Sequence, residues 1–353
     1  MATQSYLQRV LGSTPSPDFG NLQAVLAKGL PVRPTLFEFF LNGRLYKRLS
    51  AVSGLPTDDD YGMARVLTAA FYQAGYDYVT FKPPAFCFPA GARGHEQTLS
   101  LNEGALITNR ETFESYEWIH PDDCGDYDML ERISSDLPDG MKVVLYGPGG
   151  VLENVIRLAG YDNLCFMIAD DPELTQELFD AVGSRLVRHY ELGCEHESVG
   201  AAISNDDWGF KTQPMLSPAD LRTFVFPWHK RIVEAIHNAG DLAILHSCGN
   251  ASEIMEDIIE DMGFDGKHSY EDTIEPVESI YEDYQERIAI LGGVDLDFLV
   301  RSEPDKVYRR ARALLEQSAD TGGYALGTGN SVPEYVPDEN YCAMIWAALE
   351  VRA

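Results

Sequence analysis

The fold is decided by the stretch Asp241-Leu-Ala-Ile-Leu-His-Ser-Cys-Gly-Asn250. Its apolar residues Leu242 to Leu245 predict a short buried strand, and Gly249 predicts a turn directly after it. Side chains two residues apart in a strand share one face, so His246 and Cys248 lie together at the strand's end. Imidazole and thiolate ligands suit zinc better than calcium or magnesium. The stretch therefore predicts either a zinc-binding strand end or an ordinary buried strand that closes with a turn.

Composition limits the classes of partner. The chain has 353 residues, 45% of them hydrophobic, enough for two ordinary domains or one large barrel. Its 56 acidic and 27 basic residues give a net charge of −29, which argues against nucleic acid or an anionic membrane as partner. No stretch is apolar enough to span a membrane, and no secretory signal is recognisable, so a cytoplasmic location is expected. The six cysteines are widely spaced and are expected to be reduced.

Strand and helix signals alternate from Pro34 onward, which is typical of a parallel α/β sheet. Residues 1–30 are predicted to form an N-terminal helical cover. The eight predicted strands cover residues 35–40, 76–81, 142–146, 201–205, 242–245, 263–268, 288–291 and 323–326. Eight strand-helix units predict a (β/α)8 TIM barrel, with a doubly wound open sheet as the alternative. The whole chain, 1–353, is thus expected to be a single barrel domain.

Two helices have clear end signals. Ser217 is expected to cap a helix that runs to Asn238, and Asp171-Pro172 is expected to start another that ends near Leu192. The connection 82–140, after the second strand, is long enough to be a functional loop over the barrel mouth or a surface excursion. The sequence contains no nucleotide-binding glycine motif and no serine-hydrolase elbow.

Polar residues follow the predicted strands, and barrel enzymes hold their catalytic groups at the C-terminal ends of strands. In chain order they are Glu38, Lys82, Tyr146, Glu153, Asp206, Asp207, Trp208, His246, Cys248, Tyr270, Glu271, Asp295 and Asn330. Structural alternatives exist: Glu38 can pair with a nearby arginine, Glu153 suits the first turn of a helix, and Asp295 suits a helix cap. Asp206 and Asp207 are adjacent and point apart, so at most one should enter the mouth.

In the order and spacing of several short motifs, residues 20–350 resemble the uroporphyrinogen decarboxylase superfamily. These motifs are Gly147-Pro-Gly149, Asp206-Asp-Trp-Gly209, His246-Ser-Cys-Gly-Asn250, Gly292-Gly-Val-Asp295 and Gly327-Thr-Gly-Asn-Ser331. The resemblance implies a (β/α)8 barrel and one of two chemistries, either decarboxylation of a tetrapyrrole or methyl transfer linked to a corrinoid.

The decarboxylase branch carries an arginine-rich R-Q-A-G-R-Y segment near its first strand, which binds the substrate's carboxylates. This chain has Pro31-Val-Arg-Pro-Thr-Leu-Phe-Glu-Phe-Phe40 there, and Phe81-Lys-Pro-Pro84 replaces the aspartate expected after strand two. Binding many carboxylates requires clustered guanidinium groups. The cations expected near the mouth are only Arg33, Arg44, Lys47, Arg48 and Lys82. The sequence therefore resembles the methyltransferase branch more closely.

In that branch, zinc is held by an H-x-C pair and by a third cysteine near the end of strand eight. His246 and Cys248 match the pair, whereas the third position aligns with Asn330. One carboxylate is expected to complete the zinc ligand set and to leave one coordination position open. The candidates for that carboxylate are Glu153, Asp206, Asp207 and Glu271.

The resemblance implies transfer of a methyl group between a small methylated compound and a corrinoid (cobalamin) on a partner protein, with zinc assisting. The substrate classes are methoxy, methylamine and thiol compounds, and a methoxy oxygen is favoured because Asn330 replaces a thiolate. Expected catalytic residues are Glu153, Asp206, Asp207, His246, Glu271 and Asn330, with His246 and Cys248 as metal ligands. The alternatives are a decarboxylase acting on a tetrapyrrole or another acid and a non-catalytic ligand-binding barrel. The oligomeric state stays open, a homo-oligomer included.

Overall fold

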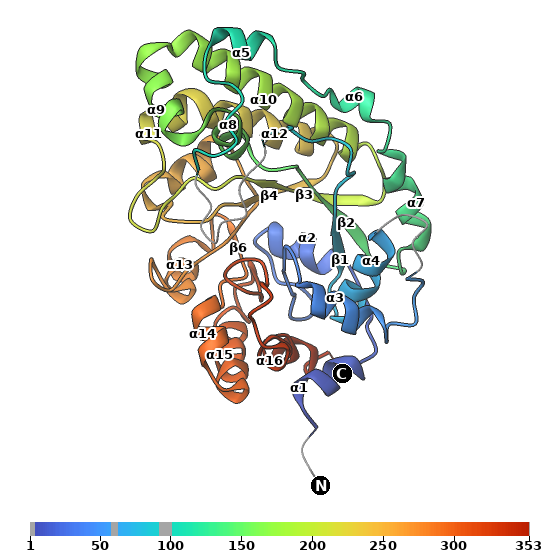
Figure 1. The fold of residues 1–353 in the computed structure, drawn as a ribbon. Helices are drawn as coiled ribbons and strands as arrows, with labels where there is room; N and C mark the ends of the chain where they lie inside the picture. The colour runs from blue at the N-terminus through green and yellow to red at the C-terminus, as the bar shows by residue number, and fades with distance from the viewer. Residues whose placement is uncertain (1–3, 58–62, 92–100, 353) are drawn as a thin grey trace.

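The computed structural model describes residues 4–57, 63–91 and 101–352, and a single parallel sheet organises them. Its strands are β1 (Tyr78–Phe81), β2 (Lys142–Tyr146), β3 (Val199–Asn205), β4 (Leu242–His246), β5 (Gly266–His268), β6 (Ala289–Leu291) and β7 (Tyr324–Ala325). They lie side by side in chain order, which excludes the doubly wound alternative. Figure 1 shows the sheet curling, with helices outside it, as in a TIM barrel. The predicted fold class is confirmed.

The prediction of eight strands is wrong by one, because residues 35–40 form only an isolated bridge from Leu36 to Leu326. Phe37 donates its N–H to the Leu326 carbonyl at 2.9 Å. On the other side, hydroxyl groups replace a backbone ladder: Tyr78 Oη contacts the N–H and the carbonyl of Glu38, each at 2.7 Å. The segment is thus held between β7 and β1 largely by side-chain hydrogen bonds, which is why it does not form a regular strand.

Helices connect the strands. They are α1 (Tyr6–Leu11), α2 (Gly20–Leu26), α3 (Gly43–Ser50), α4 (Ala64–Gln73), α5 (Arg110–Glu114), α6 (Pro121–Cys124), α7 (Asp128–Asp136), α8 (Val151–Ala159), α9 (Tyr161–Asp170), α10 (Pro172–Cys194), α11 (Pro218–Asp220), α12 (Phe226–Asn238), α13 (Val277–Tyr284), α14 (Leu296–Arg301), α15 (Pro304–Gln317) and α16 (Asp338–Leu349). Shorter turns are the π-helical η1 (Leu221–Val225) and η3 (Asp257–Asp261) and the 3-10 helix η2 (Ser252–Ile254).

Both predicted helix starts are confirmed. Ser217 Oγ accepts the N–H of Asp220 at 3.1 Å, and Asp171 Oδ1 accepts that of Leu174 at 3.0 Å. The helix predicted from Ser217 is not continuous, because the π-helical turn η1 separates α11 from α12. Pro227 lies at the start of α12 and has no N–H to donate, so the regular hydrogen-bond ladder cannot continue through this point.

Helix α2 and its cap residue Phe19 lie at the N-terminal end of the barrel, beside the starts of β3 and β5, whereas α1 packs against α16. Residues 1–3 of the predicted cover are outside the described residues. Phe19 and Leu26 fill the barrel end beside glycines: a Cβ at Gly200 of β3 would lie 2.5 Å from Phe19, and one at Gly266 of β5 would lie 2.7 Å from Leu26. Only glycine at these two positions leaves room for the side chains of Phe19 and Leu26.

The long connection after β1 contains α5, α6 and α7, so it is a structured excursion in the parts that the structure describes, 82–91 and 101–140. It packs against α10, where Tyr127 Oη lies 2.7 Å from His189 Nδ1. Arg188 of α10 also binds Asp122 of α6 at 2.7 Å. These contacts anchor the connection to the barrel wall.

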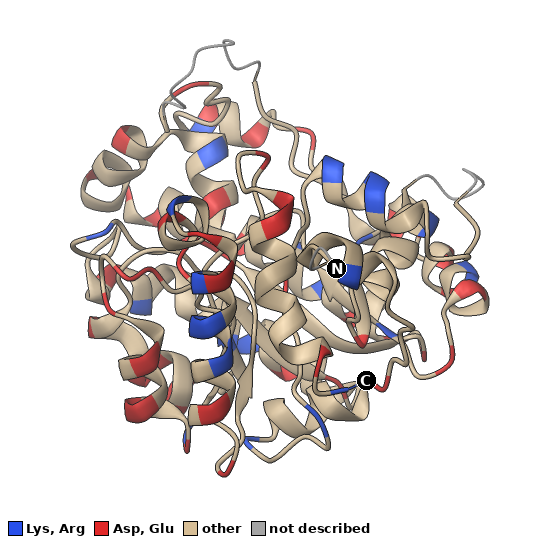
Figure 2. Cartoon of the chain, turned by 90° about the horizontal axis from the view of Figure 1, so that it is seen from below, with Lys and Arg blue, Asp and Glu red and all other residues tan. Residues whose placement is uncertain are grey.

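Charged groups lie mainly on the outer helices, where acidic and basic segments are interspersed (Figure 2). Their surface ion pairs include Arg287 with Glu256 and Glu260, each at 2.7 Å. Exposed pairs of this kind contribute little to stability. Among the described residues, the structure contains no helix with the length and apolarity needed to cross a membrane.

Candidate metal centre

Three potential metal ligands meet at the C-terminal edge of the sheet. His246 is the last residue of β4, Cys248 follows it by two positions, and Asp207 follows β3. One carboxylate oxygen, one imidazole nitrogen and the thiol sulfur of these residues all lie within 4.8 Å of one another. The expected His/Cys/carboxylate set is therefore assembled, with Asp207 as the carboxylate.

The geometry of this set fits zinc. Cys248 Sγ lies 3.7 Å from His246 Nε2, close to the roughly 3.6 Å that a tetrahedral zinc with ordinary bond lengths imposes on such a pair. Sulfur, imidazole and carboxylate are all zinc ligands, and three protein ligands leave a fourth position for a substrate or water. Calcium and magnesium would prefer oxygen ligands.

The hydrogen bonds of His246 determine which ring nitrogen faces the centre. His268 Nε2 lies 3.2 Å from the carbonyl oxygen of Thr328, which can only accept, so His268 carries its proton on Nε2. A neutral His268 then accepts through Nδ1, which lies 2.8 Å from Nδ1 of His246. His246 must donate there, so the lone pair on its Nε2 points to Cys248. This is the tautomer that a metal ligand requires.

Burial supports the neutral state of both imidazoles. It lowers the pKa of His268 to about 3, against a weaker opposing effect of the Thr328 carbonyl. It also lowers the pKa of His246, with further lowering by His268 and Lys267. Neither ring is therefore protonated at neutral pH, and His246 is available as a ligand without first losing a proton.

Side chains from the loops after β5 and β7 hold the thiol of Cys248. Asn330 donates from Nδ2 to Cys248 Sγ at 3.1 Å, and Ser269 Oγ lies 3.4 Å from the same sulfur. Asp207 Oδ1 accepts the Cys248 N–H at 2.9 Å. Burial and the charge of Asp207 raise the thiol pKa to about 12, so a cation is needed to form the thiolate at neutral pH.

Asp206 has a different position from its neighbour Asp207. Its carboxylate is fully buried and accepts the N–H groups of Leu152 at 2.8 Å and Glu153 at 2.9 Å, at the start of α8. It also binds His229 Nε2 at 2.8 Å. Asp206 therefore ties α8 and α12 to the end of β3, and its oxygens are not directed to the centre. The two acids do point apart.

The remaining candidate residues lie around the centre and not within its ligand set. Glu153 is half-buried, and its carboxylate accepts the N–H of Gly150 at 3.0 Å. Its pKa is raised by burial and by the neighbouring acids Asp206 and Asp207. Glu271 lies beside Lys211, with 3.9 Å between Oε2 and Nζ.

Asp295, for which the sequence left a capping role open, caps α14 by accepting the N–H of Phe298 at 2.9 Å. Glu38, for which the sequence left pairing with a nearby arginine open, pairs with neither Arg33 nor Arg44, which bind Asp77 and Asp338. Its carboxyl group is fully buried and binds the Thr328 hydroxyl at 2.8 and 2.9 Å. Burial raises the pKa of Glu38 to about 8, so it is protonated at neutral pH.

Replacing Glu38 by glutamine should reduce the loss of stability that occurs as the pH rises from about 4.5 to about 8. The pKa of Glu38 is raised by folding, so its favourable contribution is complete below about pH 4.5 and is lost as the pH rises through about 8. Thermal unfolding at about pH 5 and about pH 8 measures this. The stability of Glu38→Gln relative to wild type should be higher at about pH 8 than at about pH 5. If the stability difference between variant and wild type is the same at both pH values, Glu38 is not protonated in the folded protein.

Two further residues of this centre, Lys267 and Ser269, were not predicted from the sequence. Lys267 is 2% exposed, and its Nζ donates to the carbonyl of Ser269 at 2.8 Å. Burial lowers the pKa of Lys267 to about 8, against a weaker opposing effect of the neighbouring Cys248 and Asp207. Ser269 has a φ of 84°, a strained conformation for a non-glycine residue that is typical of functional sites. Lys267 could have been recognised from the sequence, because a lysine inside a predicted buried strand is unusual.

A cavity of about 450 Å³ opens beside the centre, next to Asn330 and Glu271. Asn330 lies between this cavity and the Cys248 sulfur. On the other side, the Phe39 ring lies 4.9 Å from the His246 ring and 5.3 Å from Tyr146. The centre thus has aromatic rings beside His246, and Asn330 separates Cys248 from a cavity large enough for a small molecule.

Comparison with known proteins gives consistent relationships. The model of the family described as uroporphyrinogen decarboxylase (URO-D) matches residues 126–351. The methylated-thiol–coenzyme M methyltransferase of Methanosarcina mazei is 29% identical over 178 residues, which are 50% of this chain and 46% of that protein. The matched part therefore spans less than half of that relative's length. A solved structure, a methyltransferase from Methanosarcina mazei, has a TM-score of 0.69 and 18% identity over 94% of this chain and 98% of its own.

Proposed function

The chain belongs to the uroporphyrinogen decarboxylase family, and on that basis we propose that it moves a methyl group between a small methylated compound and a corrinoid carried by a partner protein. Its similarity to methyltransferases supports methyl transfer as the general reaction. The observation that supports zinc-assisted transfer is that Asp207, His246 and Cys248 converge at the strand ends.

In this proposal zinc is the resident metal, held by the Asp207 carboxylate, His246 Nε2 and Cys248 Sγ. Bound zinc supplies Lewis acidity toward the atom that bears the methyl group. The chain's own groups prepare the site: His268 directs the His246 lone pair, and the Asn330 amide hydrogen bond withdraws charge from the sulfur. A ligand set with one thiolate is less electron-rich than one with two, and this favours polarisation of a methoxy oxygen. The similarity to the methylated-thiol–coenzyme M methyltransferase of Methanosarcina mazei instead favours a methylated thiol as substrate.

Tetrapyrrole decarboxylation is not supported by the arrangement of cations. Arg33, expected near the mouth, instead pairs with Asp77 at 2.5 Å, just before β1 and at the opposite end of the sheet. Arg44 and Arg48 are both paired with Asp338, at 3.0 and 2.9 Å. The part of the chain that the structure describes therefore gathers no guanidinium cluster for a polycarboxylate at the mouth.

The activity is tested by incubating the purified protein with cob(I)alamin and a panel of methylated thiols, methoxy compounds and methylamines. We expect the cobalamin spectrum to change to that of methylcobalamin with at least one class. Reaction with the thiols alone or with the methoxy compounds alone assigns the substrate class. Release of CO₂ from a tetrapyrrole acid, with no methyl transfer, would contradict the proposal and favour the decarboxylase alternative.

His268 is expected to control metal affinity without being a ligand. Replacing it with phenylalanine removes the acceptor for His246 Nδ1–H and should weaken zinc binding about 10- to 100-fold. Glutamine offers one acceptor and one donor, so His268→Gln should retain more of the affinity. Competition with a chromophoric chelator measures both variants. Equal zinc affinities for wild type and His268→Phe would show that the imidazole pair has no such role.

A further inference from the structure

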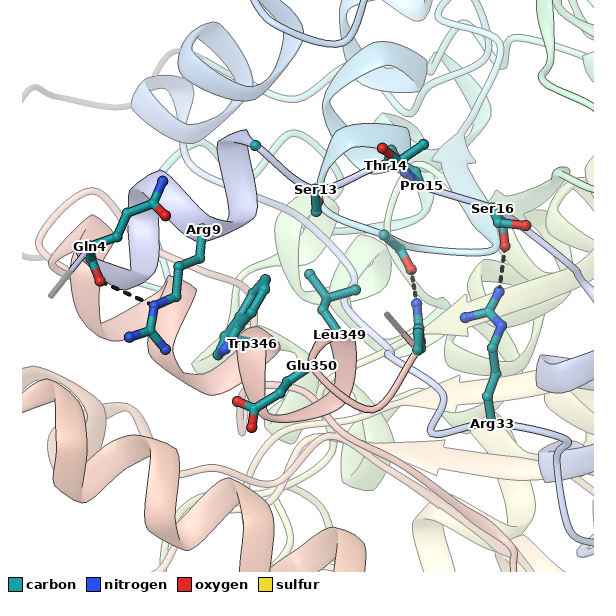
Figure 3. Close-up of a pocket in the computed structure, with 13 residues that line it drawn as sticks. Gln4, Arg9, Ser13, Thr14, Pro15, Ser16, Arg33, Trp346, Leu349 and Glu350 are labelled. Atoms are coloured by element: carbon teal, nitrogen blue, oxygen red, sulfur yellow. Dashed lines mark hydrogen bonds between the residues drawn. The ribbon is translucent and has the colours of Figure 1, made fainter.

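A second cavity, of about 790 Å³, lies at the N-terminal side of the barrel, away from the metal centre. Residues 12–16 and the end of α16 line it, together with Arg9, Arg33 and Arg352 (Figure 3). Glu350 is the one acidic residue among the lining residues that the structure describes. Counting the buried Asp77 that pairs with Arg33, three guanidinium groups face two carboxylates, which leaves a net positive site in a chain of net charge −29.

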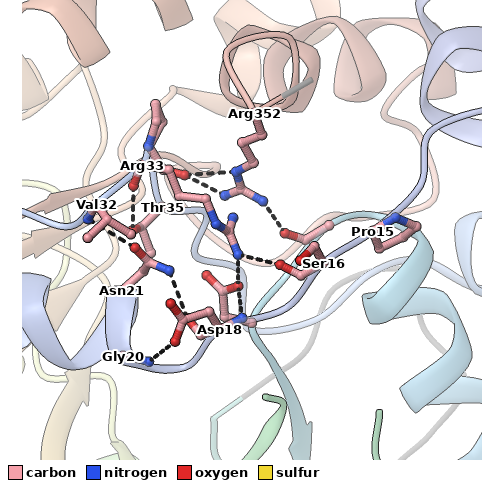
Figure 4. Close-up of polar contacts among 12 residues, drawn as sticks. Pro15, Ser16, Asp18, Gly20, Asn21, Val32, Arg33, Thr35 and Arg352 are labelled. Atoms are coloured by element: carbon pink, nitrogen blue, oxygen red, sulfur yellow. Dashed lines mark hydrogen bonds and ion pairs between the residues drawn. The ribbon is translucent and has the colours of Figure 1, made fainter. Parts of the chain in front are cut away.

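Two of the arginines form a pair of like charges (Figure 4). Arg352 donates to the carbonyl oxygens of Pro34 and Gly75, which are neutral, and within 4–57, 63–91 and 101–352 it has no carboxylate hydrogen bond. Arg33 binds Asp77 and the carbonyl of Ser16. Burial and the charge of Arg33 lower the pKa of Arg352 to about 10. The buried carboxylate of Asp77 thus faces two guanidinium groups, and a bound anion would relieve their repulsion.

The rest of the cavity is aromatic and apolar. Figure 3 shows Trp346 and Leu349 between Arg9 and Arg33. The guanidinium carbon of Arg9 lies 5.8 Å from the Trp346 ring, and its Nε donates to the Gln4 carbonyl at 3.1 Å. The two terminal nitrogens of Arg9 have no hydrogen-bond or ion-pair partner among the residues that the structure describes, and its guanidinium carbon also lies 5.1 Å from the Tyr6 ring.

We propose that this cavity binds a small molecule in which a phosphate or carboxylate group is attached to a flat apolar ring. The anionic group lies at Arg33 and Arg352, where the buried Nη1 of Arg33 has no hydrogen-bond partner among the described residues and can donate to either kind of anion. The ring lies along Trp346 toward Arg9, where aromatic and cation–π contacts are available. The inference is independent of methyl transfer, since none of these residues contributes to the metal centre.

Isothermal titration calorimetry of the full chain at low salt tests the chemistry with four probes. Phenyl phosphate and benzoate carry both features, inorganic phosphate carries only the anion, and phenol carries only the ring. We expect one or both of the first two to bind at least about tenfold more tightly than the last two, a difference of about 1.4 kcal/mol. Their relative affinities distinguish phosphate from carboxylate, and added salt should weaken binding.

Variants locate the binding. Arg352→Gln removes one cation of the pair, and Trp346→Leu removes the ring surface but leaves every charge in place. Each should weaken binding of the better probe at least about tenfold. Arg301→Gln is the matched control, because Arg301 is 78% exposed and pairs only with Asp297 at 2.8 Å among described residues.

Circular dichroism shows whether each variant is folded. If Arg352→Gln does not fold, Trp346→Leu still decides the question, because it leaves the buried charges unchanged. The proposal is wrong if neither ring-bearing anion binds at millimolar concentration, or if both bind equally well to wild type and to Trp346→Leu.

Discussion

Replacing Cys248 by alanine is expected to remove the bound metal and abolish methyl transfer while leaving the barrel folded. The sulfur contributes the one soft ligand of the set and lies 3.7 Å from His246 Nε2. Cys248 follows the end of β4 and is partly exposed, so losing its side chain removes little core packing. Metal content by mass spectrometry, methylcobalamin formation and circular dichroism measure the three outcomes.

Cys165→Ala is the matched control, since Cys165 is an exposed thiol on α9 outside the ligand cluster. It should keep the metal content and the activity of wild type. Full activity of Cys248→Ala would rule out a metal mechanism, and His246 would then be better explained as a proton donor or substrate ligand.

The second large effect is expected at Asp206, and on stability. Alanine at this position leaves three buried donors without an acceptor: the N–H groups of Leu152 and Glu153 and Nε2 of His229. Unpaired buried groups of this kind cost roughly 3–5 kcal/mol together. Chemical denaturation measures the loss. Asp206→Asn keeps the shape and one acceptor oxygen, so it should lose less stability.

Asp207→Ala should affect metal binding more than stability, because among the described residues its carboxylate accepts one hydrogen bond, from the N–H of Cys248 at 2.9 Å. We expect a stability loss of about 1 kcal/mol together with loss of the metal. If Asp206→Ala were as stable as Asp207→Ala, or if Asp207→Ala kept its metal, the division of roles between the two acids would be wrong.

The sequence predicts the barrel well because its strands are short apolar runs with turn residues behind them. The ends of β2 are predicted to the residue, and β4 differs by one. The missing strand at residues 35–40 shows the limit of such patterns. That stretch has the apolar residues of a strand, but the hydroxyl groups of Tyr78 and Thr80 hold its backbone where a ladder would otherwise form. Hydrogen bonds from side chains distant in the sequence, which here replace backbone ladder bonds, leave no signal in the local sequence pattern.

For the metal centre too, some features follow from the local sequence and others depend on the tertiary structure. The spacing of His246 and Cys248 predicts their proximity, because it follows from strand geometry alone. Which acid joins them depends on the turn after β3, so the sequence could not separate Asp207 from Asp206, Glu153 or Glu271. The role of His268 was also inaccessible, since it depends on the register of β5 beside β4, where His246 pairs with His268. The single-domain organisation of the chain and the corrinoid partner remain proposals.

Metal analysis of the protein, purified without chelator or added metal, tests the central claim most directly. We expect about one zinc ion per chain in wild type and a small fraction of that in Cys248→Ala and Asp207→Ala. X-ray absorption at the zinc edge should then show one sulfur ligand with nitrogen and oxygen. A wild-type protein that transfers methyl groups while free of metal, or a zinc ion that all three variants (Cys248→Ala, Asp207→Ala and the Cys165→Ala control) retain equally, would contradict the account.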